Sequence, residues 1–169
     1  MSAPVKLLLI GAGGRMGLAI TRLAGSGAVP GFRVVAAVDR PDSPLAGQDI
    51  GAAAGLPPLG VPVGADLSAA LAAGADAAVD FSSPAASAAA APVLAAAGLP
   101  WVVGTTGLGD AEKAAVARAA THIPVVLSAN MSVGINLLYA LVEQAARALR
   151  GRGYDCDITE RHHRRKKDA

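Results

Sequence analysis

Residues 5–17 read Val5-Lys6-Leu7-Leu8-Leu9-Ile10-Gly11-Ala12-Gly13-Gly14-Arg15-Met16-Gly17. The apolar run at 5–10 is typical of a strand that is buried on both faces. A glycine-rich run follows at 11–17, and a helix is expected after it, with Met16, Ile20 and Leu23 on its apolar face. A strand, a glycine turn and a helix in this order predict the first unit of a Rossmann-type fold.

The glycine turn is a candidate dinucleotide site. Glycine lets the backbone approach a pyrophosphate, whose charge is stabilised by the N–H groups at the start of the helix. Asp39 ends the second expected strand, 22 residues after Gly17, where a carboxylate can bind the adenosine ribose hydroxyls. Arg40 beside it can instead meet a 2′-phosphate, so NADH and NADPH are expected to bind with comparable affinity. The predicted cofactor contacts here are Gly11, Ala12, Gly13, Gly14, Arg15, Met16, Asp39 and Arg40. A tight strand–helix turn without a ligand is the alternative.

The rest of the first 130 residues alternates β-rich and alanine-rich runs. This alternation indicates an α/β fold: a Rossmann-type parallel sheet with helices on both faces. The segment 41–64 is rich in proline and glycine and is expected to form a long loop. Later strands are expected at 33–38, 76–81, 101–104 and 124–128, and later helices at 67–73, 84–97 and 110–120.

Polar loops follow three of these strands. Ligands bind at the carboxyl ends of parallel strands, so the loops at 104–107 and 128–132 are expected to form a nicotinamide pocket. The predicted contacts are Gly104, Thr105, Thr106, Ser128, Ala129, Asn130 and Met131. The loop at 81–84 lies at the same edge, but a turn and a helix cap are the better interpretation of its Ser82 and Ser83.

After residue 130 the pattern changes. Ser132 can cap a long helix through about residue 150, and Gly151 and Gly153 can end it. The segment 154–160 then alternates apolar and polar residues, which predicts a half-buried strand with Cys156 on its core side. These features predict a dinucleotide-binding domain at 1–130, followed at 131–169 by the first helix and strand of a truncated α+β substrate and oligomerisation domain.

The last ten residues read Glu160-Arg161-His162-His163-Arg164-Arg165-Lys166-Lys167-Asp168-Ala169. They combine a candidate proton donor with several cations at the end of the expected strand. A solvated basic end, a localisation signal or a purification scar is the alternative. Adjacent histidines on an extended segment point to opposite sides, and the chain offers only Cys156 and His122 as further soft ligands, so no metal site is expected.

Charge and cysteine content exclude several classes of protein. Residues 161–167 hold five of the fifteen Lys and Arg, which leaves ten against twelve Asp and Glu in 1–160. The pI near 9.0 is therefore mostly a property of the tail, and nucleic-acid binding is not expected. One cysteine excludes an intrachain disulfide and fits a reducing compartment. With no signal-peptide pattern and no long uninterrupted apolar stretch, we expect a cytoplasmic protein without a membrane partner.

Four motifs together resemble one family. The stretches 11–17, 104–107, 129–136 and 160–169 look like those of 4-hydroxy-tetrahydrodipicolinate reductase, also called dihydrodipicolinate reductase, of bacterial lysine and diaminopimelate synthesis. The resemblance covers the whole chain in order, but only the first part of the family's length. The family signature continues into Pro-Ser-Gly-Thr, and this chain ends just before it.

The resemblance implies reduction of a cyclic dicarboxylate by NADH or NADPH. In it, His162 matches the proton donor, Lys166 the second catalytic cation, and His163 a substrate-contacting position. It also implies a homotetramer when the chain is full length, and it places Met131 where many members have an aromatic residue. Two other readings stay open: a dinucleotide-binding fragment without turnover, and another two-domain dehydrogenase that would use a catalytic cysteine or a different lysine.

Overall fold

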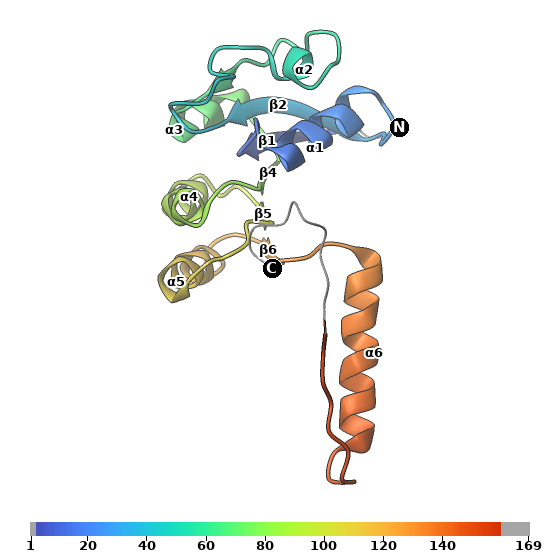
Figure 1. Ribbon diagram of the computed structural model, residues 1–169. Helices are drawn as coiled ribbons and strands as arrows, with labels where there is room; N and C mark the ends of the chain where they lie inside the picture. Colours follow the sequence, from blue (N-terminus) through green and yellow to red (C-terminus); the bar gives the residue numbers. More distant parts are fainter. Residues whose placement is uncertain (1–2, 160–169) are drawn as a thin grey trace. The chain divides into compact units, whose positions relative to one another are not determined.

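The computed structural model describes residues 3–159. The chain divides into two compact units, Met1–Ala129 and Asn130–Ala169, termed unit 1 and unit 2 below. Unit 1 contains a parallel sheet with helices on both faces, and unit 2 contains one long helix (Figure 1).

The sheet of unit 1 has six strands in the order β3-β2-β1-β4-β5-β6, all parallel. Its order reverses between β1 and β4, which is where α/β sheets form a ligand crevice. The predicted Rossmann-type fold is confirmed. The strands are β1 (Val5–Ile10), β2 (Phe32–Val38), β3 (Val63–Gly64), β4 (Ala77–Asp80), β5 (Trp101–Val103) and β6 (Val125–Leu127).

Helices cover both faces of this sheet (Figure 1). On one face Leu8 of β1 and Trp101 of β5 pack with Leu94, all almost fully buried. On the other face Leu7 and Leu9 pack with Ile50. Because neighbouring residues of β1 are buried on opposite faces, the strand is apolar at every position from Leu7 to Ile10. The helices are α1 (Arg15–Gly25), α2 (Ile50–Ala53), α3 (Leu67–Ala70), the 3₁₀ turn η1 (Leu71–Ala73), α4 (Pro84–Ala96) and α5 (Asp110–Ala119).

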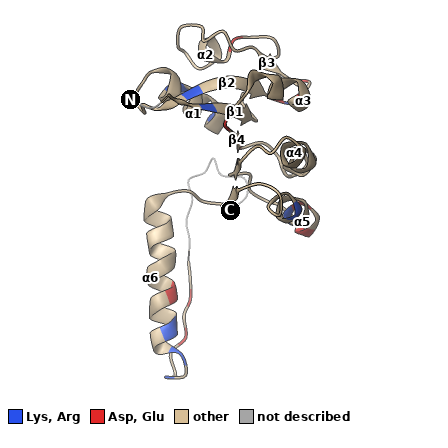
Figure 2. Cartoon of the chain, turned by 180° about the vertical axis from the view of Figure 1, so that it is seen from behind, with Lys and Arg blue, Asp and Glu red and all other residues tan. Residues whose placement is uncertain are grey.

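Helix α4 starts as its sequence predicts. The Ser83 hydroxyl accepts the N–H of Ala86, and Pro84 occupies the first turn, where its missing N–H is not needed. Helix α4 carries no charged residue, whereas α5 carries both signs, acidic in its first turn and Arg118 in its last (Figure 2). This arrangement in α5 complements the helix dipole.

The face of α1 that meets the sheet differs from the prediction. Met16 and Leu23 are 47% and 49% exposed, while the buried residues of the helix are Gly17 and Thr21. A Cβ at Gly17 would collide with the backbone of Ala12, so glycine lets this helix approach the first strand closely. Ile20, predicted on the same face, does pack against the core, but the apolar pattern alone could not show that Gly17 and Thr21 are the buried residues.

The segment 41–64 is not only a loop. It contains α2 and β3, and it is folded around one carboxylate. Asp49 accepts the N–H groups of Ala52 at 3.0 Å, Leu59 at 3.0 Å and Val61 at 2.9 Å. The hydrogen bond from Leu59, ahead of those from Ala52, Val61 and Gly60, lowers the pKa of Asp49 from 3.8 to about 2.

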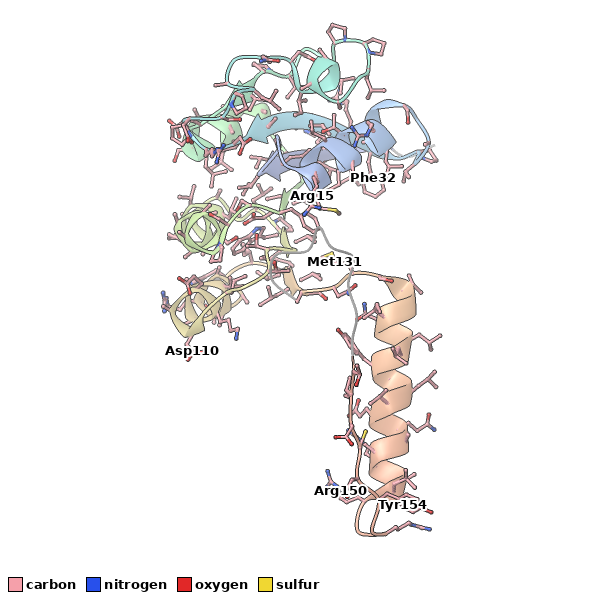
Figure 3. The ribbon with its side chains drawn as sticks, viewed as in Figure 1. Arg15, Phe32, Asp110, Met131, Arg150 and Tyr154 are labelled. Carbon is pink, nitrogen blue, oxygen red and sulfur yellow. The ribbon has the colours of Figure 1, made fainter. Side chains whose placement is uncertain are left out.

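Unit 2 is built on α6 (Val133–Leu149). The Ser132 hydroxyl accepts the N–H of Ile135, and Gly151 and Gly153 follow the helix with positive φ, as predicted. No described residue of α6 is buried: its apolar stripe is open, with Leu137 60% exposed. Figure 3 shows its side chains standing away from the helix axis.

The expected strand after α6 is not formed. Residues 154–159 lie outside any strand, and Cys156, predicted to face a core, is exposed. A strand needs a neighbour to complete its backbone hydrogen bonds, and the described part of unit 2 supplies only a helix. The alternating pattern therefore indicates a preference for strand structure, which residues 154–159 can adopt only beside another strand.

Within residues 3–159 no helix combines the length and the apolar character that crossing a membrane requires.

Candidate functional site

A cavity of about 730 Å³ opens at the carboxyl ends of β1, β2 and β4. Three walls enclose it: the glycine loop, the segment that follows β2, and the loop after β4 together with α4. This is the crevice at which the strand order reverses. From the glycine loop and the β2 segment the lining includes Gly11, Gly13, Gly14, Asp39, Arg40, Ser43 and Leu45, and from the third wall Phe81, Ser82, Ser83, Ala86 and Val93.

The glycine loop passes close to the segment that follows β4. Gly11 has φ +75°, and a Cβ there would lie 2.7 Å from the carbonyl oxygen of Phe81. Gly14 is the N-cap of α1 and brings no side-chain cap, so the first-turn N–H groups of this helix face outward uncapped. Arg15 lies at this end with its side chain exposed (Figure 3). An uncapped helix start beside a cavity fits a pyrophosphate.

Like Arg15, two further predicted contacts in this loop, Ala12 and Met16, lie outside the cavity lining. Ala12 is fully buried in the core beneath α1, and its N–H donates to the carbonyl of Val38 at 3.0 Å. Met16 is half-exposed at the first turn of α1 and does not line the cavity. Of the two, only Met16 offers a side chain at the surface.

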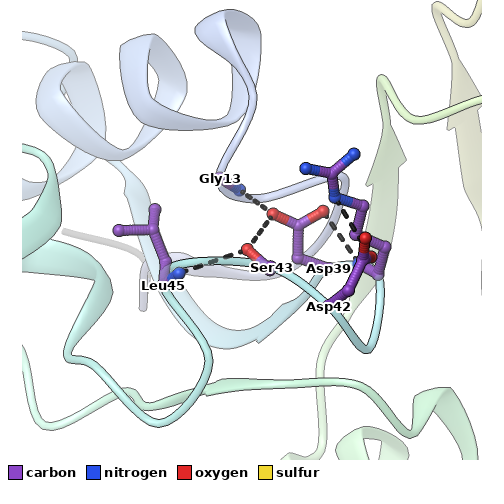
Figure 4. A network of polar contacts seen from close by, with 6 residues as sticks. Gly13, Asp39, Asp42, Ser43 and Leu45 are labelled. Atoms are coloured by element: carbon purple, nitrogen blue, oxygen red, sulfur yellow. Dashed lines mark hydrogen bonds and ion pairs between the residues drawn. The ribbon is translucent and has the colours of Figure 1, made fainter.

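Asp39 sits at the centre of a hydrogen-bond network on the second wall (Figure 4). Its Oδ2 accepts the Gly13 N–H at 3.2 Å and the Ser43 hydroxyl at 2.9 Å, and its Oδ1 accepts the Arg40 N–H at 2.9 Å. A Cβ at Gly13 would collide with Oδ2, so this glycine is required by the carboxylate as well as by a ligand. The Arg40 Nε lies 3.3 Å from Asp42 Oδ1.

A second carboxylate, Asp80 at the end of β4, is fully buried and was missed by the sequence analysis. It accepts the Ser82 N–H at 2.9 Å, the Ser82 hydroxyl at 2.5 Å, the Ser87 hydroxyl at 2.8 Å and the Thr105 hydroxyl at 3.2 Å. A buried charge without such donors would be costly. The available signal was an acidic residue ending an apolar strand, followed by Phe81 and then by two serines.

This network accounts for two residues that were predicted as cofactor contacts. The Thr105 hydroxyl also accepts the Ser82 N–H at 3.1 Å and lies 2.9 Å from the Ser87 hydroxyl, so its side chain is committed to the interior. Gly104 makes room for the Phe81 ring, because a Cβ there would overlap that ring. Both residues therefore support the wall formed by Phe81 and Ser82, and any ligand contact of theirs would run through backbone groups.

The remaining predicted residues fall outside the cavity lining. Thr106 and Ala129 are exposed and Ser128 is half-buried, at the carboxyl ends of β5 and β6. In unit 2, Asn130 builds the start of α6: its Oδ1 accepts the Ser132 N–H at 2.9 Å, and its carbonyl accepts the Asn136 amide at 2.9 Å. Met131 is exposed. The predicted His162, His163 and Lys166 lie outside the described residues.

Two family models match this chain in succession. The model described as dihydrodipicolinate reductase, N-terminus, matches residues 5–131, and the model described as dihydrodipicolinate reductase, C-terminus, matches residues 134–169.

Curated relatives agree with this match. The 4-hydroxy-tetrahydrodipicolinate reductase of Anaeromyxobacter sp. is 52% identical over 165 residues, which are 98% of this chain and 59% of the relative. That of Halorhodospira halophila is 49% identical over 161 residues, 95% of this chain and 59% of the relative. The chain therefore spans about three fifths of the length of these curated relatives.

Solved structures support the fold. A dipicolinate-bound dihydrodipicolinate reductase from Paenisporosarcina sp. superposes with a TM-score of 0.62 at 18% identity, over 85% of this chain and 54% of that one. An oxidoreductase from Agrobacterium radiobacter, solved with NAD⁺, L-tartaric acid and magnesium, superposes with a TM-score of 0.58 at 22% identity, over 85% of this chain and 41% of that one.

Proposed function

This chain belongs to the dihydrodipicolinate reductase family, and from that premise we propose that the whole protein reduces 4-hydroxy-tetrahydrodipicolinate to tetrahydrodipicolinate with NADH or NADPH. The reaction would serve lysine and diaminopimelate biosynthesis. The observation that carries the proposal is the cavity of unit 1, where an uncapped helix start and an anchored carboxylate lie on facing walls.

The residues of unit 1 fit a dinucleotide. The N–H groups at the start of α1 would hold the pyrophosphate, because Gly14 leaves them without a side-chain cap. Asp39 would hold the adenosine ribose through its carboxylate. Bound there, a reduced nicotinamide dinucleotide supplies the hydride. The loops at 104–106 and 128–131 are proposed to border the nicotinamide.

The substrate is proposed to meet the C-terminal motif. Hydride addition to a conjugated imine leaves an atom that needs a proton, and His162 can supply one near neutral pH. Lys166 would bind substrate charge close to the reacting atoms, and His163 would contact the substrate, since carboxylates bind cations through strong hydrogen bonds. These roles rest on the resemblance of 160–169 to the family motif.

The proposed setting of the whole protein is a cytoplasmic homotetramer, as in the family it resembles. A single cysteine, which is exposed, supports a reducing compartment. The alternative function is a dinucleotide-binding fragment without turnover in the 1–169 form. The open apolar stripe of α6 favours it, because unit 2 buries no residue of this helix.

The two functions can be separated with two proteins. The first is the chain 1–169, and the second is this chain followed by the remainder of the Anaeromyxobacter relative, which shares 52% of its residues. We expect both to bind NADH in calorimetry, and only the extended protein to reduce substrate and to restore growth of a diaminopimelate auxotroph that lacks the reductase. A folded extended protein that binds NADH without reducing substrate would contradict the proposed activity.

A further inference from the structure

The segment after β2 carries three charged side chains, of which Asp39 and Arg40 line the cavity and Asp42 lies beside Arg40 (Figure 4). Asp39 and Asp42 are acidic, and Arg40 between them is basic. The Arg40 Nε lies 3.3 Å from Asp42 Oδ1, with 67% and 79% of the two side chains exposed. The guanidinium that could meet a 2′-phosphate is thus already paired, and the three side chains together carry one net negative charge.

Ser43 fixes the orientation of Asp39. Ser43 is buried, and its hydroxyl donates to Asp39 Oδ2 at 2.9 Å. The Ser43 Oγ also accepts the Leu45 N–H at 3.3 Å. The Leu45 contact sets the position of the hydroxyl oxygen, and the hydroxyl in turn holds the carboxylate beside the glycine loop. Ser43 is therefore a positioning residue for Asp39.

The hydrogen bonds of Asp39 leave it ready for a donor. Each carboxylate oxygen can accept about two hydrogen bonds. Oδ2 accepts from Gly13 and Ser43, whereas Oδ1 accepts only from Arg40 among the described residues. A ribose hydroxyl can donate to the remaining position on Oδ1. A 2′-phosphate is an acceptor with negative charge, and it would meet a carboxylate that is held in place.

We propose that Asp42 and Ser43 make this site selective for NADH over NADPH. Asp42 withdraws Arg40 from a 2′-phosphate, and Ser43 holds Asp39 where the ribose diol binds. The inference rests on the proposed dinucleotide function and goes beyond it. It also changes the expectation of comparable affinities, which considered Asp39 and Arg40 without the neighbours that fix them.

The test is calorimetric titration of the 1–169 chain with NADH and with NADPH. Wild type should bind NADH more tightly. Asp42→Asn should tighten NADPH binding by about 3- to 10-fold, because exposed ion pairs are weak but a like charge is also removed. Ser43→Ala should weaken NADH binding by about 3- to 10-fold with a smaller effect on NADPH, because one hydrogen bond to a charged group is lost.

Two matched variants serve as controls. Asp110→Asn removes the same charge from an exposed position on α5, and Ser26→Ala removes a hydroxyl from the exposed end of α1. Neither should change the ratio of the two affinities. A double-mutant cycle tests whether Ser43 acts on NADH affinity through Asp39 or only through the stability of the fold. In an Asp39→Ala background, Ser43→Ala should leave NADH affinity unchanged, since the carboxylate that its hydroxyl positions is gone.

The outcomes separate this inference from the proposed function. Absence of binding by the folded wild-type chain would overturn both. Binding with equal or tighter affinity for NADPH would overturn the selectivity alone, and so would an unchanged affinity ratio in Asp42→Asn. Asp42→Asn changes an exposed side chain, so this variant is expected to fold even if Ser43→Ala does not. An equal loss on Ser43→Ala with and without Asp39 would show that Ser43 does not act through the carboxylate.

Discussion

Units 1 and 2 of this chain each contain a helix rich in apolar residues, α4 and α6, but they bury these helices to different extents. In α4 of unit 1, Leu94 is fully buried, whereas in α6 of unit 2, Leu137 and Leu141 are 60% and 53% exposed. The difference lies in what surrounds each helix. Helix α4 packs on a sheet and against α5, while α6 is the only helix or strand assigned in the described part of unit 2.

The comparison shows what an apolar stripe does and does not predict. In unit 2 it predicts α6, and Ser83 and Ser132 cap α4 and α6 as the sequence indicates. It does not identify the surface that covers the stripe. Cofactor binding should therefore be a property of unit 1, and the proposed chemistry should require residues that complete unit 2.

The largest expected effect tests whether cofactor binding and chemistry depend on different units. In the extended protein, His162→Ala should lower kcat by about 10²–10⁴-fold, the usual contribution of a general acid. The Kd of NADH should stay unchanged, because the cavity lies in unit 1. Steady-state kinetics and calorimetry on the same preparation measure both. An unchanged kcat would remove His162 from the chemistry, and a parallel loss of NADH affinity would break the division between the units.

A leucine-to-alanine substitution in each unit compares how much a buried and an exposed leucine contribute to stability. Leu94→Ala should lower the free energy of unfolding by about 2–5 kcal/mol, because it opens a cavity in a packed core. Leu137→Ala should change it by no more than about 0.5 kcal/mol, as is usual for exposed positions. Urea denaturation of the 1–169 chain gives both values. Equal losses would mean that the α6 stripe is covered in solution, and light scattering would then show whether a second copy covers it.

A smaller effect is expected for the buried carboxylate. Asp80→Asn replaces one carboxylate oxygen, which accepts hydrogen bonds, by an NH₂ group, which cannot accept them. Because four donors surround this carboxylate, the substitution should lower the free energy of unfolding by about 1–3 kcal/mol. Asp157→Asn, at an exposed position of unit 2, is the control and should cost almost nothing. If the two variants have the same free energy of unfolding, the network around Asp80 contributes no net stability to unit 1.

The smallest effect concerns pH. The pKa of Asp49 falls from 3.8 in the unfolded chain to about 2 in the folded one, so its contribution to stability is complete above pH 3.8 and disappears as the pH falls towards 2. Asp49→Asn should flatten that part of the stability profile, measured by denaturation between pH 2 and 5. Asp155→Asn in unit 2 should leave it unchanged. A profile that keeps its slope without Asp49 would assign the slope to other carboxylates.

The features read correctly from the sequence are local ones. The strand, glycine turn and helix at 5–25, the cap of α4 and the acidic end of β2 each depend on residues that are close in the chain. The features that were missed depend on distant partners. Asp49 organises its segment through Leu59 and Val61, 10 and 12 residues away, and Asp80 meets Thr105, 25 residues away. Neither pairing leaves a periodic signal.

The candidate site divides in the same way. Gly13 and Asp39 were predicted as cofactor contacts from spacing, and the structure brings them together through a hydrogen bond. Ser43 was not predicted, because nothing in a proline- and glycine-rich segment shows which hydroxyl turns inward. The strand expected at 154–160 was wrong for residues 154–159 because alternation reports a preference that only a neighbouring strand can realise.

The aromatic residues are partitioned between the units, and this gives the chain a built-in optical label. The only tryptophan, Trp101, is 1% exposed in unit 1, and its indole Nε1 has no partner within residues 3–159. Both tyrosines, Tyr139 and Tyr154, are exposed in unit 2. Indole emission, blue-shifted in its dry setting, therefore follows the melting of unit 1 alone. Phenol-to-indole energy transfer reports how far the second unit lies from the first, without any dye attached.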